Sequence, residues 1–205
     1  MNRIAVVGYG NAVNPIWLYE IRRCGCGVLA LPLVGAAALG LALTSLDAAP
    51  VIRSGALAIL PLLIGLSAAA ALGREQLLEL QLTVRTPYPL TVARRVALVL
   101  GSGVCAVLPF ELFGAPTSGA SLAGALASVL ALISVATYIS VGFGSAAGAS
   151  ALVTTVWLAK VLVLEQLSRA LPIQMMLLLA LVAVCGSLTA LRVADSEPQL
   201  QGVSS

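Results

Sequence analysis

Long apolar runs alternate with short polar breaks along most of this 205-residue chain. A helix needs about 20 apolar residues to cross roughly 30 Å of hydrocarbon, and runs of that length recur six times. The pattern therefore predicts an all-α integral membrane protein with six spanning helices in one transmembrane domain. These spans are expected at about 25–46, 54–73, 95–113, 119–141, 147–167 and 171–192.

Two clusters of small residues divide the longest uncharged stretch. Leu112 to Ala159 contains no charge, and its 48 residues are too many for one crossing. The stretch is interrupted by "GAPTSGAS" at 114–121 and by "GFGSAAGAS" at 142–150. Glycine, serine and proline favour turns, so we expect the chain to reverse direction at both clusters.

A short polar and aromatic stretch, "NPIWLYEIRR" at 14–23, precedes the first span. Asn14 suits a helix cap and Pro15 the first helical position. Ten residues cannot cross a bilayer, so the stretch predicts a helix lying at the membrane interface. Its expected anchors are Trp17, Tyr19, Arg22 and Arg23. The alternative is a polar leader without a structural role.

The spacing within 14–23 also predicts which residues lie on the apolar side of this helix and which lie on its polar side. Trp17, Leu18 and Ile21 fall on one side of a helix. Glu20 and Arg23 are three residues apart, a spacing at which opposite charges interact on a helix surface. We therefore expect Glu20 and Arg23 to share a polar side.

The segment "REQLLELQLTVRTPYPLTVARR", residues 74 to 95, is the one long charged stretch between spans. Residues 74–83 are good helix formers, and Pro87 and Pro89 then stop the helix. Thr91 suits the cap of the next helix. We predict a short amphipathic helix within 74–93, held beneath the bilayer, whose leucines are left to fill a groove on a partner.

Composition indicates that the chain lies in a membrane, and the distribution of charge indicates its orientation there. Hydrophobic residues make up 60% of the chain and charged residues 9%, against about 45–50% and about 25% in soluble domains. With both termini inside, the inner segments hold eight arginines and the outer loops two. Cytoplasmic loops carry the excess of Lys and Arg, so we expect 74–95 to face the cytoplasm. The dispersed net charge of +3 does not favour nucleic-acid binding.

The residue inventory excludes several kinds of chemistry. The chain has no histidine, which removes Ser-His and Cys-His hydrolases and most zinc sites. Its four cysteines are not spaced as a ligand set, and we expect neither catalytic residues nor a metal site. "RIAVVGYGNAV" at 3–13 is similar to a dinucleotide-binding loop, but Val13 replaces the third glycine. We therefore expect no nucleotide site there.

The charged segment resembles the cytoplasmic segment between the second and third spans of type-2 ATP-binding-cassette (ABC-2) export permeases. That family pattern has a glutamate, then Leu-Glu-Leu-x-Leu, a Thr/Ser-x-Pro turn and a basic residue entering the third span. The matching residues are Glu75, Leu78, Glu79, Leu80, Leu82, Thr86, Pro87 and Arg94. The six spans, the interfacial helix and the inward termini resemble the family more loosely.

The resemblance implies a non-enzymatic permease subunit in the cytoplasmic membrane of a prokaryote, exporting a hydrophobic or lipid-like substrate. The chain has no phosphate-binding loop, so ATP and Mg²⁺ would be bound by separate ATPase subunits. A second permease subunit, identical or not, would complete the path. Glu75 and Glu79 would make polar contacts to the ATPase, and the leucines would fill its groove. The alternative is a solvated connecting loop that carries only positive-inside charge.

The acidic and basic residues near the spans suggest where a substrate passes. Lys160, the only lysine, lies within the fifth predicted span, where an ionised side chain costs about 2.5–3.5 kcal/mol unless it is paired or hydrated. Glu165 and Glu111 are its candidate partners. The three are expected to form either a polar patch on the path or outer gate, or a structural ion pair.

Two other classes of function stay open at this point. An ion-coupled secondary carrier would work alone and normally shows intramembrane acids and paired repeats. A non-transporting scaffold would use the charged segment only to bind a partner.

Overall fold

The computed structural model describes residues 13–45, 50–73, 88–114, 119–164 and 171–201. Apart from Gly25, Gly144 and Ser145, every described residue is helical. In order, the helices are α1 (Val13–Cys24), α2 (Cys26–Ser45), α3 (Pro50–Gly73), α5 (Tyr88–Gly114), α6 (Gly119–Phe143), α7 (Ala146–Ala159), a π-helical turn (Lys160–Leu164) and α9 (Leu171–Gln201).

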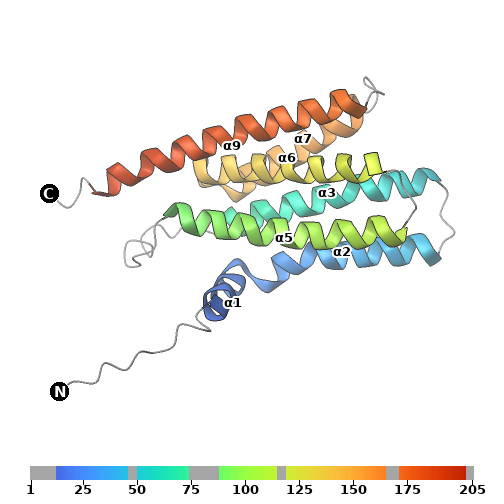
Figure 1. The fold of residues 1–205 in the computed structure, drawn as a ribbon, viewed down its shortest axis with the longest axis horizontal. Coiled ribbons are helices and arrows are strands. Elements are labelled where there is room, and N and C mark those ends of the chain that lie inside the picture. The colour runs from blue at the N-terminus through green and yellow to red at the C-terminus, as the bar shows by residue number, and fades with distance from the viewer. Residues whose placement is uncertain (1–12, 46–49, 74–87, 115–118, 165–170, 202–205) are drawn as a thin grey trace, which may run out of the picture.

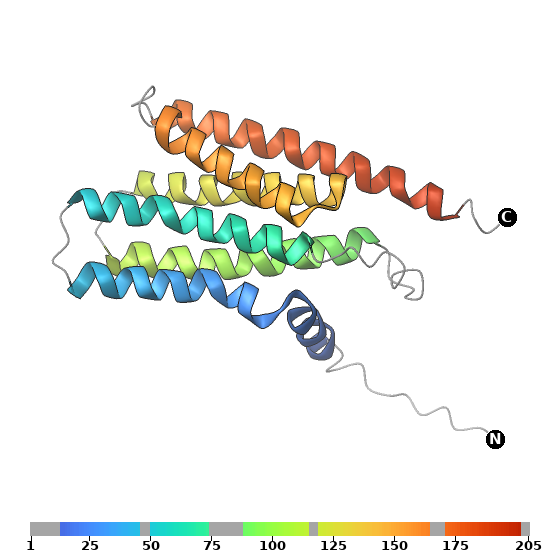
Figure 2. The same cartoon turned by 180° about the vertical axis from the view of Figure 1, so that it is seen from behind.

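The long helices run side by side, and α1 lies across them at one end (Figures 1 and 2). Helix α3 packs against α2, α5, α6 and α7, while α6 packs against α3, α5, α7 and α9. These two helices therefore form the centre of the bundle. Helices α2 and α9 lie at opposite edges of it (Figure 1).

Among the described residues, five helices are long and apolar enough to cross a membrane. They are α2, α5, α6, α7 with its π-helical turn, and α9. The fold is thus all-α over the described residues, as in a multi-pass membrane protein. Helix α3 has a shorter apolar stretch, Ala58–Gly73, so the count of six spans stays a prediction.

The predicted boundaries differ from the observed ones mainly at α5 and α9. Helix α5 begins at Tyr88, so residues 88–93, which we expected in the connecting segment, are helical. Pro89 is compatible with this because the first helical turn has no use for its missing N–H. Thr91 is consequently a buried residue inside α5 and not its cap. Helix α9 continues to Gln201.

Glycines with positive φ make both described connections. Gly25, with φ 88°, alone joins α1 to α2, and its carbonyl accepts from the Val28 amide at 3.0 Å. Gly144, with φ 62°, follows α6, and the Ser145 hydroxyl then caps α7 by accepting from the Gly148 amide at 3.0 Å. A side chain at positive φ is disfavoured, which explains glycine at these turns. The predicted reversal at 142–150 is confirmed.

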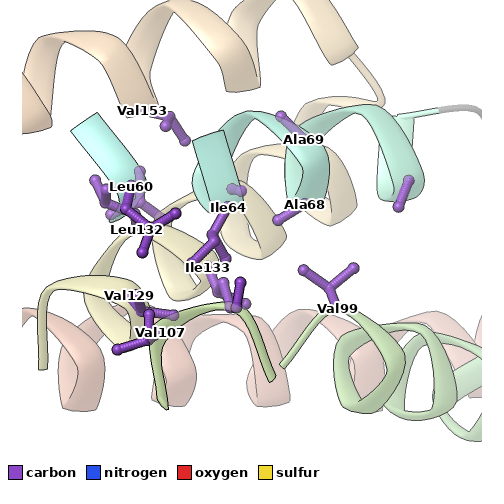
Figure 3. Close-up of a cluster of buried hydrophobic side chains, with 14 of the residues drawn as sticks. Leu60, Ile64, Ala68, Ala69, Val99, Val107, Val129, Leu132, Ile133 and Val153 are labelled. Carbon is purple, nitrogen blue, oxygen red and sulfur yellow. The ribbon is translucent and has the colours of Figure 1, made fainter. Parts of the chain in front are cut away.

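The core lies where α3 crosses α6, with α5 and α7 on either side (Figure 3). Ile64 of α3 and Ile133 of α6 are almost fully buried there. Close approach depends on Gly65, since a Cβ atom at that position would lie 3.0 Å from the Cβ of Leu132. Lipid tails are as apolar as this core, so tight packing of small residues stabilises the helix contacts.

Candidate functional site

Most of the described arginines gather at one end of the bundle. The connection from α1 to α2, the end of α3, the start of α5, the turn from α6 to α7 and the end of α9 all lie at this end (Figure 1). We call it the basic end, after Arg22, Arg23, Arg94, Arg95 and Arg192. Its assignment to the cytoplasmic side stays a prediction from the positive-inside rule.

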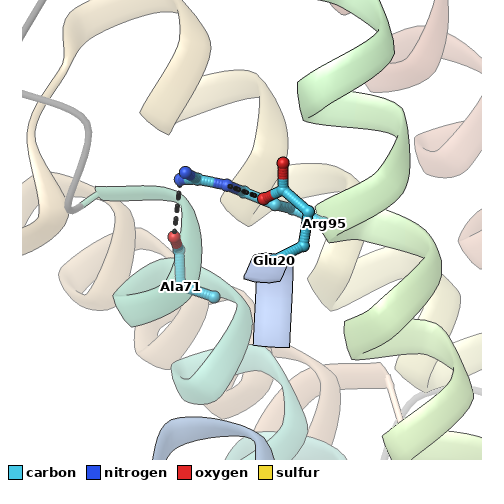
Figure 4. A network of polar contacts seen from close by, with 3 residues as sticks. All are labelled: Glu20, Ala71 and Arg95. Carbon is cyan, nitrogen blue, oxygen red and sulfur yellow. Dashed lines mark hydrogen bonds and ion pairs between the residues drawn. The ribbon is translucent and has the colours of Figure 1, made fainter. Parts of the chain in front are cut away.

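A buried ion pair joins α1 to α5 at the basic end (Figure 4). Arg95 Nε of α5 lies 3.7 Å from Glu20 Oε2 of α1. The side chains are only 2% and 6% exposed, respectively. Removing one partner of a buried pair typically costs about 3–5 kcal/mol, because the other charge is then left in a low-dielectric environment. Glu20 and Arg95 therefore depend on each other.

The same arginine also holds the end of α3. Arg95 Nη1 donates to the Ala71 carbonyl at 3.4 Å (Figure 4). The last four carbonyls of a helix lack a partner within the helix and carry its negative dipole end. The guanidinium of Arg95 gives the Ala71 carbonyl a hydrogen-bond donor and places a positive charge near the negative end of the α3 dipole. Arg95 thus connects α1, α3 and α5.

This junction lies between the helices that flank the predicted coupling segment. Ala71 is in the last turn of α3, which ends at Gly73, and Arg95 is in the second turn of α5, which begins at Tyr88. The intervening segment, 74–87, leaves α3 and enters α5 at the basic end. At this end a hydrogen bond from Arg95 joins the two flanking helices, which also pack against each other.

The coupling residues predicted from the sequence fall almost entirely in that segment. Arg94 is described and is partly buried next to Arg95 on α5. The remaining predicted contacts lie outside the described residues: Glu75, Leu78, Glu79, Leu80, Leu82, Thr86 and Pro87. Their role stays a prediction.

A helix, α1, lies where the interfacial helix was predicted, and its position at a membrane interface stays a prediction. Its sides differ from the expectation. Trp17 is 37% exposed, and Arg22 and Arg23 are exposed as well. The side chain of Tyr19 lies outside the described residues. Glu20 does not share a surface with Arg23, because it turns into the bundle and pairs with Arg95. The local i,i+3 interpretation of these two charges is wrong.

Lys160 lies at a change of helical type. It ends α7, begins the π-helical turn and is partly buried. Its predicted partners are not tested, because Glu165 and the side chain of Glu111 lie outside the described residues. One turn earlier, Trp157 Nε1 donates to the Ala58 carbonyl at 2.6 Å and joins α7 to α3.

An apolar groove of about 570 Å³ lies between α5, α6 and α9, in the half of the bundle nearer the basic end. Its lining contains no charged residue, and its polar members are Ser134, Thr137 and Thr189. The hydroxyls of Thr137 and Thr189 donate to carbonyls of their own helices, each at 2.7 Å. The groove therefore suits hydrocarbon better than a charged or sugar-like group.

No pattern in the sequence points directly to the Glu20–Arg95 pair. One indirect signal exists: Arg94 and Arg95 are neighbours in a helix, so their side chains point about 100° apart. On a helix packed on several sides, one of them can then face the surface while the other faces a neighbouring helix. Over the part of the chain that the structure describes, no cluster of His, Cys, Asp and Glu is arranged to hold a metal ion.

No protein-family model, curated protein or solved structure matches this chain.

Proposed function

We propose that this chain is the membrane-spanning permease subunit of an ATP-driven exporter of the ABC-2 type. It works with separate ATPase subunits, which bind ATP and Mg²⁺, and with a second permease subunit. The observation that carries the proposal is the hydrogen bond from Arg95 to the Ala71 carbonyl, because it joins the two helices between which the family-like segment lies.

A coupling segment transmits movement only if both of its ends are firmly attached to the spans. Were α3 and α5 independent at the basic end, a push on 74–87 would separate them without moving the bundle. Arg95 holds them together and adds α1 through Glu20. A partner that pushes on 74–87 therefore acts on three helices at once, as a rigid-body switch requires.

The groove supports the proposed class of substrate. Its aliphatic lining, without a charged side chain, is compatible with a hydrophobic or lipid-like molecule. It lies in the half of the bundle nearer the basic end, where a substrate from the leaflet at that end would enter. Lys160 of the opposite half stays the candidate for an outer gate.

The orientation follows from charge. Five described arginines lie at the basic end, and an excess of Lys and Arg is typical of cytoplasmic loops. With the basic end inside, the segment 74–87 faces the compartment that supplies ATP, as a coupling segment must in the cytoplasmic membrane of a prokaryote.

Reversing the charge of Glu79 tests this function directly. In Glu79→Arg we expect normal membrane insertion, loss of transport and loss of transport-coupled ATPase activity, because the variant places like charge against the partner surface that binds a carboxylate. Gln81→Arg is the matched control, since it adds the same side chain two residues away and keeps Glu79. Normal coupling in Glu79→Arg would remove this residue from the proposal.

Copurification from the native membrane separates the three classes of function. A bound soluble subunit with nucleotide-dependent activity supports the exporter. Transport by the chain alone, driven by an ion gradient, supports a secondary carrier. A stable partner without ATPase activity supports a scaffold.

A further inference from the structure

The apolar groove lies entirely within the membrane-crossing parts of α5, α6 and α9. Each of its lining residues belongs to one of three apolar stretches: Pro89–Pro109, Leu122–Phe143 and Pro172–Ala194. The groove begins near the basic end, at Pro89 and Ala194, and it reaches Leu100 and Gly186 about halfway along α5 and α9. A molecule can therefore enter the groove sideways from the hydrocarbon of a bilayer, without passing through water.

The groove is as long as one leaflet of a bilayer is thick. Its wall on α5 runs from Pro89 to Leu100, which at 1.5 Å per residue is a length of about 16 Å. The hydrocarbon of a bilayer is roughly 30 Å thick, so one leaflet contributes about 15 Å. In a membrane, the groove would thus extend from the surface at the basic end to the centre of the bilayer.

The groove is also narrow. A volume of about 570 Å³ divided by a length of about 16 Å gives a mean cross-section of about 35 Å². A helix about 10 Å across needs about twice that area. The groove is therefore too narrow to enclose a helix of a second copy, whereas it is wide enough for a single hydrocarbon chain.

Small residues keep the groove open on the side of α9. Gly186, Ala190 and Ala194 carry at most one side-chain carbon each, and a Cβ atom on Gly186 would have no atom within 4 Å. Water is not held by an apolar cavity, and no charged residue lines this one. A hydrocarbon chain in the groove would instead contact α5, α6 and α9, and so gain dispersion contacts on three sides.

We propose that this groove binds one acyl chain of a phospholipid from the leaflet at the basic end. The chain lies parallel to the helices, with its ester group near Pro89 and Ala194 and its methyl end near Leu100 and Gly186. The lack of charge in the lining leaves the headgroup outside the groove. The inference does not rest on the proposed function, because the binding of a chain needs neither ATP nor an ATPase subunit.

Photo-cross-linking in vesicles tests the proposal. The protein is placed in phosphatidylcholine that contains a small fraction of phosphatidylcholine with a diazirine at the methyl end of one acyl chain, and the labelled residues are located by mass spectrometry. We expect stronger labelling of Leu100 and Leu130 than of Val184 and Leu188, which lie exposed on α9 outside the groove. A diazirine next to the ester group should instead label residues around Ala194.

Filling the deep end of the groove should abolish this preference. The side chain of Gly186→Leu enters open space, so we expect a several-fold loss of labelling at Leu100 with an unchanged unfolding midpoint. Gly101→Leu is the matched control, because Gly101 is exposed, has no atom within 4 Å of a Cβ position and lies outside the lining. It should keep the labelling. Ala190→Leu, which narrows the groove one turn nearer its mouth, replaces Gly186→Leu if that variant does not fold.

Three results would overturn the proposal. Equal labelling of Leu130 and Leu188 would show that lipids only surround the protein. Undiminished labelling of Leu100 in a folded groove-filling variant would show that the chain lies elsewhere. Protection of the whole groove from both probes, together with cross-links between two copies of the chain, would show that a second subunit covers it.

Discussion

Helices α6 and α9 are equally hydrophobic and yet differ in position. Their apolar stretches, Leu122–Phe143 and Pro172–Ala194, have mean hydropathies of 2.1 and 2.2. Half of the first stretch is buried inside the protein, against 11% of the second. Hydropathy alone therefore indicates that a helix can cross a membrane and leaves open whether its neighbours are lipids or other helices.

The difference lies in the size and polarity of the side chains. Helix α6 buries Ala131 and Ala136, and it buries Ser128 and Thr137, whose hydroxyls donate to carbonyls of α6 itself. Helix α9 exposes large aliphatic residues such as Met176, at 73%. Lipid tails are as apolar as leucine, so hydrophobicity does not separate a central helix from a peripheral one. Small residues that permit close packing are what is typical of the central helix.

The largest effect is expected from enlarging a small buried residue of α6. Ala136→Leu places three extra carbons where the side chain is fully buried, and such overpacking lowers the free energy of unfolding by about 1–3 kcal/mol. Ala180→Leu makes the same change on the exposed side of α9 and should stay within about 0.5 kcal/mol. Unfolding by a denaturing detergent in mixed micelles measures both. Equal losses would mean that α9 is also enclosed by protein.

Adding one methyl group to a glycine should change stability in opposite directions in the two regions. A Cβ atom on Gly65 would lie 3.0 Å from Leu132 Cβ of α6 and 2.8 Å from Val153 Cγ1 of α7. Gly65→Ala is therefore expected to lower the free energy of unfolding by about 1 kcal/mol. Gly186 of α9 has nothing within 4 Å of such an atom, so Gly186→Ala should raise it by about 0.4–1 kcal/mol. Unfolding by a denaturing detergent in mixed micelles measures both changes. Stabilisation by Gly65→Ala would contradict the close packing of α3 on α6.

The smallest effect is expected where α9 meets the end of α6 in an exposed position. Arg192 Nη1 donates to the Gly142 carbonyl at 2.9 Å, and its guanidinium lies 5.4 Å from the ring centre of Phe143. Arg192→Met should lower the free energy of unfolding by about 0.5–1 kcal/mol. Phe143→Leu should have less effect in that background than alone, because the ring contact is already lost. Full additivity would show that this contact contributes nothing.

Much of this fold follows from apolar length alone. The predicted reversal between 142 and 150 coincides with the turn at Gly144, and α3 ends at Gly73 as expected. The start of α5 was misplaced because proline both ends a preceding helix and suits the first turn of the next. Local chemistry at Pro89 does not distinguish these two roles.

The Glu20–Arg95 pair could not be predicted from the sequence, for a different reason. The i,i+3 spacing within α1 indicates Arg23 as a partner for Glu20. This spacing identifies partners only within one helix and cannot predict a partner on another helix. Only the packing of α1 against α2 and α5 decides between them. The proposed contacts of Glu75 and Glu79 depend on a second protein, which no intramolecular pattern specifies.

The single glycine between α1 and α2 has a consequence for membranes of different thickness. A span that is too long for its bilayer tilts, and a stiff connection would tilt α1 with it. Gly25, at φ 88°, is a connection of one residue and permits many backbone conformations, so a change in the angle between α1 and α2 would be taken up there. With α1 at the membrane interface, as predicted, the first span would then adjust to a thinner or thicker bilayer without tilting α1.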